Sequence, residues 1–428
     1  MASNPQHQET LRKYAEAIVR VGLNLRAGQR LIITNSVARG VPPAGRELVH
    51  EVTKAAYAAG ARFVDVIWGD EEMLRLRLQN APADSFNEYP KWHIHGILDM
   101  LEKGDALLSI YANDPDVYES LDPERLGAMQ TSHLENWAPI SNLVTRNASN
   151  WSIAAAAAPA WAAKIFPDLK SEEAMEKLWQ AIFETTRATQ PDPIAAWQEH
   201  IKKLRKRADY MQAKKYDSLH YRAASPGDRS DITDFSLGLP RGHKWVSAQS
   251  LAENGVAFTA NMPTEEIFTL PDRQRAEGTV RSTFPLSYGG SLIEDFSVTF
   301  ENGKIIKVSA KKNEAILQKL VNTDEGSTRL GEVALVPASS PIATRGHLFY
   351  NTLFDENASC HIAIGRAYRF TLTGGEELTD EEFNSAGGNT SITHVDFMIG
   401  SPQMDIDGIR EDGTSEPIMR QGEWAFEV

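Results

Sequence analysis

The fold of the N-terminal half is decided around Arg30-Leu31-Ile32-Ile33-Thr34, an apolar run of strand length that follows Gly28. Ahead of it, apolar residues recur at helical intervals, at Tyr14, Ile18, Val21 and Leu25. A second cycle has a helix candidate at residues 48–59 and a strand candidate at 63–68, and a third has a helix near 94–103 and a strand at 106–110. Helices that alternate with short apolar strands predict a mostly parallel sheet flanked by helices.

The pattern changes after this alternation. Residues 171–210 are helical in periodicity, and Pro191 and Pro193 divide them into a predicted helical pair. Ser225-Pro226-Gly227-Asp228 is typical of a turn or domain junction, and the sequence beyond it is rich in strand candidates. We therefore expect an α/β fold with an N-terminal α/β domain at residues 1–225 and a strand-rich α+β domain at 226–428.

Two local patterns give more specific expectations. Asn302-Gly303 lies between the apolar alternations 296–300 and 305–308, which predicts a β-hairpin. The alanine run at residues 154–158 is interpreted as a packed turn or helix.

The bulk composition narrows the class of protein. The 428 residues are 42% hydrophobic and 24% charged, with a net charge of −14, which argues against nucleic acid as a partner. No run approaches the roughly 18 apolar residues of a membrane span, and the polar start at residues 1–10 lacks the apolar core of a signal peptide. Cys360 is the single cysteine, so we expect no intramolecular disulfide and a cytoplasmic location. The basic run at residues 202–207 is interpreted as a solvated helix face.

Metal-type side chains gather in the last two-fifths of the chain. The strongest local signal is His394-Val395-Asp396, because residues two apart on a strand project from the same face and reach a common ion. Alone, the pair is also compatible with a surface strand edge. Glu332 enters the otherwise apolar run 331–337, where a buried carboxylate needs a metal or a cation such as Arg329 or Arg345.

Three further candidates are weaker on local grounds. Glu265 and Glu266 follow a Met-Pro-Thr turn, and adjacent glutamates are common on surfaces. His361 and Tyr368 flank an apolar run, and each side chain is also typical of a packed core. Gly365 allows a bend that turns both toward one site. Mixed carboxylates and imidazoles are the ligands of hydrolytic divalent metal sites.

Taken together, four segments resemble the aminopeptidase T/aminopeptidase S family of metallo-aminopeptidases, the thermophilic aminopeptidase type. They are Asn261-Met262-Pro263-Thr264-Glu265-Glu266-Ile267-Phe268-Thr269, Leu330-Gly331-Glu332-Val333-Ala334, Phe354-Asp355-Glu356-Asn357-Ala358-Ser359-Cys360-His361-Ile362-Ala363-Ile364-Gly365, and His394-Val395-Asp396-Phe397-Met398-Ile399-Gly400. Their order and spacing match across the C-terminal half, and the combination is far more specific than any single segment.

The resemblance implies a pair of divalent ions, of zinc, cobalt, manganese or magnesium, in a catalytic C-terminal domain. The metal ligands that the resemblance implies are Glu266, Glu332, His361, His394 and Asp396, with Glu265 as the alternative to Glu266. The resemblance also implies that Tyr368 is a catalytic or metal-side residue. The implied substrates are peptides with a free N-terminus, and the implied assembly is a homodimer.

The expected mechanism uses a metal-bound water whose pKa falls from ~15.7 toward ~7. The resulting hydroxide attacks the first peptide carbonyl, and the Tyr368 hydroxyl stabilises the oxyanion. Either Glu332, counted with Tyr368 as catalytic, or Glu265 passes the proton to the leaving amine.

Two other functions compete with this one. A mononuclear iron ring-cleaving dioxygenase needs only two histidines and a carboxylate, here His361, His394 and Asp396. A non-catalytic metal-dependent binding protein is the other alternative. His93 and His95 have the spacing of a strand-borne pair but no neighbouring carboxylate, so we expect them to be structural, and we expect His347 to approach the site without binding metal.

Overall fold

The structure is a computed structural model that describes residues 4–35, 39–119, 121–223, 233–288 and 291–428. The chain forms two compact units: residues 1–200 with 249–263, and residues 201–248 with 264–428. The expected turn at 225–228 and the expected boundary at 225–226 lie outside the described residues, so that boundary stays a prediction. The α/β fold class is confirmed.

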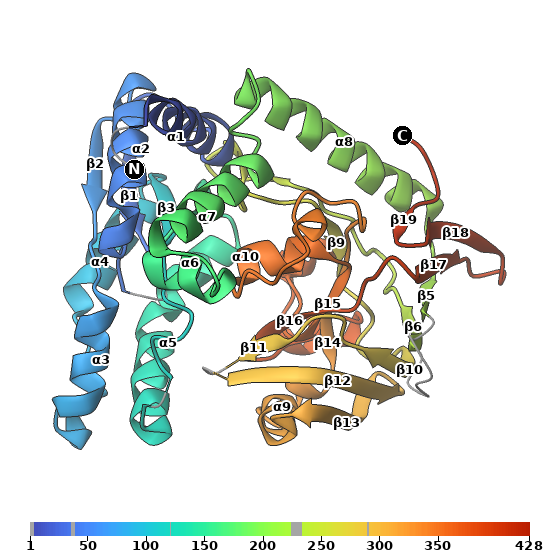
Figure 1. The fold of residues 1–428 in the computed structure, drawn as a ribbon. Helices are drawn as coiled ribbons and strands as arrows, with labels where there is room; N and C mark the ends of the chain where they lie inside the picture. The colour runs from blue at the N-terminus through green and yellow to red at the C-terminus, as the bar shows by residue number, and fades with distance from the viewer. Residues whose placement is uncertain (1–3, 36–38, 120, 224–232, 289–290) are drawn as a thin grey trace. The chain divides into compact units, whose positions relative to one another are not determined.

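The first unit is built on a parallel sheet, as the sequence predicts (Figure 1). Within the described residues it has four strands in the order β2-β1-β3-β4, and every neighbouring pair is parallel. The strands are β1 (Arg30–Thr34), β2 (Phe63–Val66), β3 (Ala106–Tyr111) and β4 (Trp151–Ala155). The apolar side chains of β1, β3 and β4 are mostly buried, as is usual in a parallel sheet, whereas the edge strand β2 is half-buried or exposed.

The alanine run contradicts the expectation for residues 154–158. Ala154 and Ala155 end strand β4, and Ala156 to Ala158 continue as buried extended chain instead of a turn or helix. The hydroxyl of Tyr14 binds both backbone groups of Ala155, donating to its carbonyl and accepting from its amide at 3.2 Å. Tertiary packing around small side chains has therefore overridden the helix propensity of alanine.

Residues 249–263 return to the first unit after an excursion into the second. They form the small hairpin of β7 (Gln249–Leu251) and β8 (Ala257–Thr259). The chain then runs along the outer edge of β4, where Met262 donates its amide to the Ile153 carbonyl at 3.0 Å. The chain crosses into the second unit at Thr264, two residues before Glu266.

The helices of the first unit match the periodicity of the sequence. They are α1 (Pro5–Ala17), α2 (Arg46–Ala58), α3 (Glu71–Asn80), α4 (Lys91–Leu101), α5 (Pro123–Thr145), α6 (Pro159–Ile165) and α7 (Ser171–Thr185), and α8 (Pro193–Lys214) begins there. A five-residue π-helical segment, Ile18–Gly22, extends α1, and 3₁₀ turns lie at Pro43–Gly45 and Ala83–Ser85. The predicted helical pair is confirmed as α7 and α8, divided at the two prolines.

Helix α8 also tests the interpretation of the basic run. Lys202, Lys203, Arg205 and Lys206 are exposed, as expected of a solvated face. Arg207 differs, because its guanidinium lies over the ring of Trp424 at 4.9 Å. Burial lowers its pKa, and the carboxylates of Glu265 and Glu423 oppose that change.

The second unit contains two antiparallel sheets. The larger has nine strands among the described residues, in the order β11-β12-β10-β6-β5-β17-β18-β19 with β13 beside β12. Its strands are β5 (Ser218–Ala223), β6 (Thr233–Gly238), β10 (Ala276–Arg281), β11 (Leu286–Tyr288), β12 (Ser291–Glu301), β13 (Lys304–Lys312), β17 (Met404–Ile409), β18 (Ser415–Arg420) and β19 (Glu423–Trp424). The predicted hairpin is confirmed by β12 and β13, which turn through Asn302 and Gly303, both with positive φ.

The smaller sheet positions the candidate site. Its order is β16-β15-β14-β9, with β9 (Ile267–Thr269), β14 (Leu330–Leu335), β15 (His361–Gly365) and β16 (His394–Met398). Every residue of β14 and β15 is buried. Short helices complete the unit: α9 (Glu314–Val321), α10 (Thr352–Asp355) and α11 (Asp380–Ser385), with 3₁₀ turns at Gly326–Thr328, Ala343–Arg345, Glu356–Ala358, Arg369–Thr371 and Gly375–Glu377.

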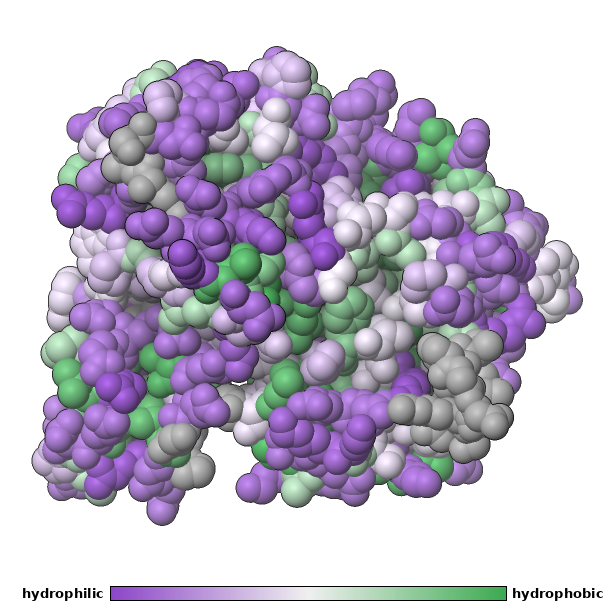
Figure 2. Space-filling model, in the orientation of Figure 1, coloured by the Kyte–Doolittle hydropathy of each residue, from purple (hydrophilic) through white to green (hydrophobic). Residues whose placement is uncertain are grey.

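The surface is consistent with the charged composition. On the face drawn in Figure 2, hydrophilic side chains predominate. Among the described residues, every helix is too short or too polar to cross a membrane.

Candidate metal centre

Three neighbouring strands carry four of the predicted site residues on one face. In the register of the sheet, Ala363 on β15 lies opposite both Glu332 on β14 and Asp396 on β16. Directly opposed residues of a β-sheet point to the same side, as do residues two apart on one strand. The ladder therefore brings His361 and His394 to the same face as the two carboxylates.

Two glycines allow the backbone to pass close to these residues. The register shifts between Leu330 and Glu332, which makes Gly331 part of a β-bulge, and a Cβ there would lie 2.2 Å from the Arg366 carbonyl oxygen. Gly365 ends β15 with φ +106°, where a Cβ would lie 2.3 Å from the Thr393 carbonyl oxygen. This positive φ is the conformational freedom expected of Gly365 from the sequence.

The side chains form two groups that share one residue. Glu266, Glu332 and His361 offer ligand atoms that all lie within 4.8 Å of one another, and so do Glu332, His394 and Asp396. Glu332 belongs to both groups through different oxygens, since Oε1 lies 3.7 Å from His361 Nε2 and Oε2 lies 3.7 Å from His394 Nε2. Glu332 is therefore the side chain that the two groups have in common.

Backbone carbonyls fix the orientation of both imidazoles. His361 Nδ1 lies 3.0 Å from the Ser359 carbonyl, and His394 Nδ1 lies 2.6 Å from the Arg366 carbonyl. Because a carbonyl only accepts hydrogen bonds, each Nδ1 carries a proton, and in the neutral ring the lone pair is on Nε2. This is the orientation that metal-binding histidines usually have.

The two Nε2 atoms face carboxylate oxygens. His361 Nε2 lies 3.1 Å from Glu266 Oε2, and His394 Nε2 lies 3.5 Å from Asp396 Oδ2. A nitrogen lone pair that faces a carboxylate oxygen is repelled unless a cation lies between them. Glu266 Oε2 and Asp396 Oδ1 are buried and accept no hydrogen bond from the described part of the chain. These residues therefore fit a bound divalent cation.

The burial of several carboxylates also favours a bound cation. Desolvation raises the pKa of Glu332 to about 7; the nearby His361 imidazole lowers it, and the Asp396 carboxylate raises it. Desolvation alone lowers the pKa of His361, but the Glu266 and Glu332 carboxylates raise it well above its usual value. The cluster thus needs positive charge, which protons or metal ions supply.

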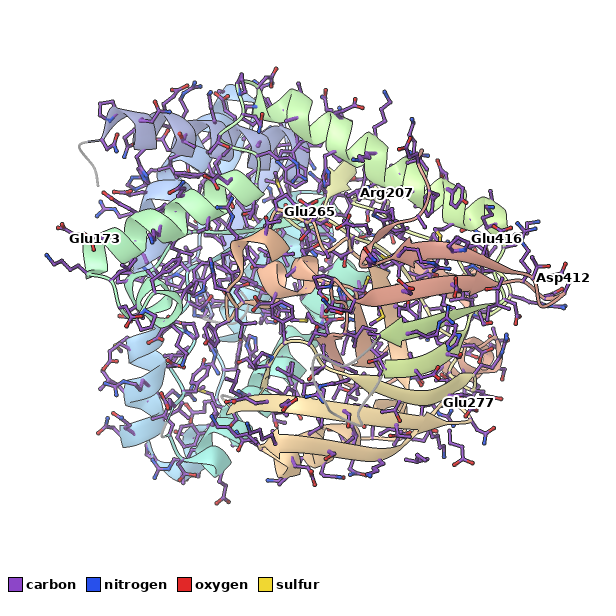
Figure 3. The ribbon with its side chains drawn as sticks, turned by 45° about the vertical axis from the view of Figure 1, so that its right-hand side comes forward. Glu173, Arg207, Glu265, Glu277, Asp412 and Glu416 are labelled. Carbon is purple, nitrogen blue, oxygen red and sulfur yellow. The ribbon has the colours of Figure 1, made fainter. Side chains whose placement is uncertain are left out.

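The two adjacent glutamates have different environments. Glu266 points into the first group, whereas Glu265 lies outside both groups and its carboxylate acts on Arg207 of helix α8 (Figure 3). The ion pair considered for Glu332 is replaced by the contacts above, and Arg329 instead binds Glu325 at 3.1 Å.

Tyr368 lies beside the second group. Its ring centroid is 4.8 Å from that of His394, and it stacks on Phe370 at 5.4 Å. Desolvation raises the pKa of Tyr368 well above its usual value, with added contributions from Glu332 and Asp396. The phenol therefore keeps its proton and is a hydrogen-bond donor.

Sequence reasoning missed Glu356, which lies in the same motif as His361. The residue as a whole is half-buried. Desolvation raises its pKa well above the usual value, followed by repulsion from Glu266 and Asp396, which are members of the cluster. The available signal was the acidic pair Asp355-Glu356, a few residues before His361 in the same motif. Asp355 has a separate role, since it accepts the backbone amides of Phe349 and Asn351 at 2.7 and 3.0 Å.

The remaining histidines of interest lie elsewhere. His93 and His95 are on helix α4 instead of a strand, so their two-residue spacing directs them to different sides, and His93 packs on Trp92. His347 contacts the ring of Phe349 and is outside both ligand groups.

A buried set of carboxylates and oriented imidazoles on an antiparallel sheet is typical of a metal-dependent hydrolase. Comparison with known proteins identifies the family. Residues 7–424 match the thermophilic metalloproteases of the M29 type, and the chain belongs to that family. The resemblance found from the sequence motifs is confirmed.

The similarity extends over whole chains. Aminopeptidase AmpS of Bacillus subtilis (strain 168) is 44% identical over 418 residues, which cover 98% of this chain and 99% of that protein. Aminopeptidase T of Thermus thermophilus is 43% identical over 417 residues, with 97% and 98% covered. The solved structure of wild-type AmpT from Thermus thermophilus has a TM-score of 0.89 at 42% identity and covers 97% of this chain and 99% of its own.

Proposed function

We propose that this metalloprotease is an aminopeptidase that removes the N-terminal residue from peptides with two divalent ions. Family membership and the names of its full-length relatives support the reaction. The observation that carries the two-ion centre is the position of Glu332 between two ligand groups. A mononuclear dioxygenase needs no second group, and neither that alternative nor a non-catalytic binding protein accounts for the family.

The proposed ligands are those expected from the sequence. Glu266, Glu332 and His361 hold one ion, and Glu332, His394 and Asp396 hold the other. Three carboxylates and two imidazoles suit zinc, cobalt or manganese, and magnesium less well because it prefers oxygen. When bound, the ions supply a water of lowered pKa and polarise the substrate carbonyl.

Two other side chains act on the substrate in this proposal. The Tyr368 hydroxyl donates a hydrogen bond to the oxygen of the scissile carbonyl as negative charge develops on it. Glu356 accepts the proton of the attacking water and delivers it to the leaving amine, because its carboxyl adjoins the carboxylates of the cluster without belonging to either ligand group. From the sequence alone, Glu332 and Glu265 were both open for this role. We favour Glu356 because Glu332 is the shared ligand of the proposed centre and Glu265 lies outside both ligand groups.

Hydrolysis of leucine p-nitroanilide and of its N-acetylated form tests the reaction. We expect cleavage of the free-amine substrate only, loss of activity after dialysis against a chelator, and recovery on addition of zinc, cobalt or manganese. Equal cleavage of the acetylated substrate would contradict an aminopeptidase, and full activity without metal would contradict a metal-dependent one.

The assembly and the location are also proposals. The resemblance to the family supports a homodimer, which light scattering of the purified protein tests directly. A single buried thiol, Cys360, is compatible with the cytoplasm, and fractionation of producing cells tests that location. We expect binding neither to nucleic acid nor to membranes.

A further inference from the structure

Two of the six acidic and imidazole side chains in the cluster lie outside its strands. The ladder hydrogen bonds of β14, β15 and β16 set the directions of the four strand-borne residues. Glu266 instead lies one residue before the three-residue strand β9, and Glu356 lies in the 3₁₀ turn Glu356–Ala358. Something other than the ladder must hold these two carboxylates in place.

The side chain of Asn357 connects the two segments. Its Oδ1 accepts the backbone amide of Glu265 at 2.7 Å, which fixes the residue immediately before Glu266. Its Nδ2 donates to the Leu353 carbonyl at 3.1 Å and lies 3.5 Å from Glu356 Oε1. The backbone amide of Glu265 only donates, so the amide orientation of Asn357 follows from the network.

The surroundings of Asn357 hold it rigidly. Its side chain has no exposed surface. Its own carbonyl accepts the hydroxyl of Ser340 at 3.0 Å, and Ser340 is itself buried. Both ends of the amide are therefore used within the protein, so Asn357 is unavailable to substrate and acts only through its neighbours.

We propose that Asn357 is a positioning residue that holds the loop-borne carboxylates Glu266 and Glu356 against the strand-borne half of the metal centre. Only a side chain with both an acceptor and a donor makes both connections. The inference rests on the proposed metal centre. Partners that orient metal ligands typically change metal affinity or activity ~10- to 100-fold when they are removed.

The test compares three variants of Asn357 with one matched control. Asn357→Ala removes the bridge, Asn357→Leu removes it while filling the same space, and Asn357→Asp restores the acceptor for the Glu265 amide. The control is Asn150→Ala in the first unit, because Asn150 is also fully buried and its Nδ2 donates to the Leu23 carbonyl at 2.8 Å. For each protein, cobalt affinity by chelator competition, the visible cobalt spectrum and the melting temperature of the metal-free form are measured.

We expect ~10- to 100-fold weaker binding of at least one cobalt ion and an altered spectrum for Asn357→Ala and Asn357→Leu, with partial recovery in Asn357→Asp. Asn150→Ala is expected to melt earlier with unchanged cobalt affinity and spectrum. If Asn357→Ala does not fold, Asn357→Leu carries the test.

Wild-type affinity and spectrum in a folded Asn357→Ala or Asn357→Leu protein would overturn the inference. Failure of the wild-type protein to bind cobalt at all would instead overturn the proposed metal centre, so the two failures are distinguishable.

Discussion

The strand-borne and the loop-borne parts of the cluster are held in different ways. The strand-borne residues are Glu332, His361, His394 and Asp396, and the loop-borne residues are Glu266 and Glu356. A β-ladder sets side-chain direction through backbone hydrogen bonds that no single substitution removes. A loop depends on individual side chains, here Asn357. The loop-borne part is thus the more easily displaced, although both parts contain carboxylates.

The largest effect is expected from the one residue that serves both groups. Glu332→Gln removes a charge and an anionic ligand from each proposed ion at once. Activity on leucine p-nitroanilide should fall more than ~10⁴-fold, beyond the range for a side chain that only carries a proton, while circular dichroism stays unchanged. Activity within tenfold of wild type at saturating metal would contradict a shared ligand.

The next prediction compares Glu356, the proposed proton carrier, with Glu265, which has no proposed role in the reaction. Glu356→Gln should lower kcat ~10²- to 10⁴-fold, the usual contribution of a proton carrier, with metal content retained. The matched variant Glu265→Gln alters a buried acid that, like Glu356, lies outside both ligand groups. It should change kcat far less and mainly lower stability, because Arg207 loses an opposing charge. Stopped assays with metal analysis measure both, and the reverse order of effects would be decisive against the assignment.

A smaller effect on activity is expected from the Tyr368 hydroxyl, which is proposed to act on the substrate. Tyr368→Phe keeps the ring against His394 and Phe370 and removes the hydroxyl. We expect kcat to fall ~100-fold with metal content and KM nearly constant, since the donor acts on charge that develops in the transition state. A loss confined to metal content would assign the hydroxyl to ion binding instead.

The smallest expected effect concerns the pH dependence of stability, at His243, outside the strand-borne and loop-borne parts of the cluster. Burial lowers the pKa of His243, although the Pro240 carbonyl and the Asp217 carboxylate oppose the shift. The unfolded chain then binds the proton more readily than the folded one, so stability is full above pH ~6.5 and is lost as the pH falls below that value. His243→Gln should reduce the fall in melting temperature between pH 8 and pH 5.5 while leaving cobalt affinity unchanged. An identical pH profile for both proteins would refute this assignment.

The sequence predicted the strand-borne part because strands have a strict period. Residues two apart on a strand lie on the same face, so the sequence placed His394 and Asp396 together. The apolar run around Glu332 predicted the strand β14. The same regularity made the parallel strands β1 and β3 predictable from runs such as residues 30–34 and 106–110.

The sequence did not predict the parts that depend on tertiary packing. Glu356 and Asn357 lie in a short turn, where no period relates position to direction. The alanine run at residues 154–158 was misassigned because alanine propensity favours a helix, while the sheet required small buried side chains at β4. His93 and His95 looked strand-like only in isolation.

The central claim is that Glu332 lies between two cations, each completed by a histidine and a further carboxylate. An anomalous difference map from crystals grown with cobalt tests it most directly. The account predicts two peaks on either side of Glu332, one beside Glu266 and His361 and the other beside His394 and Asp396. A single peak, or peaks away from these side chains, would contradict it.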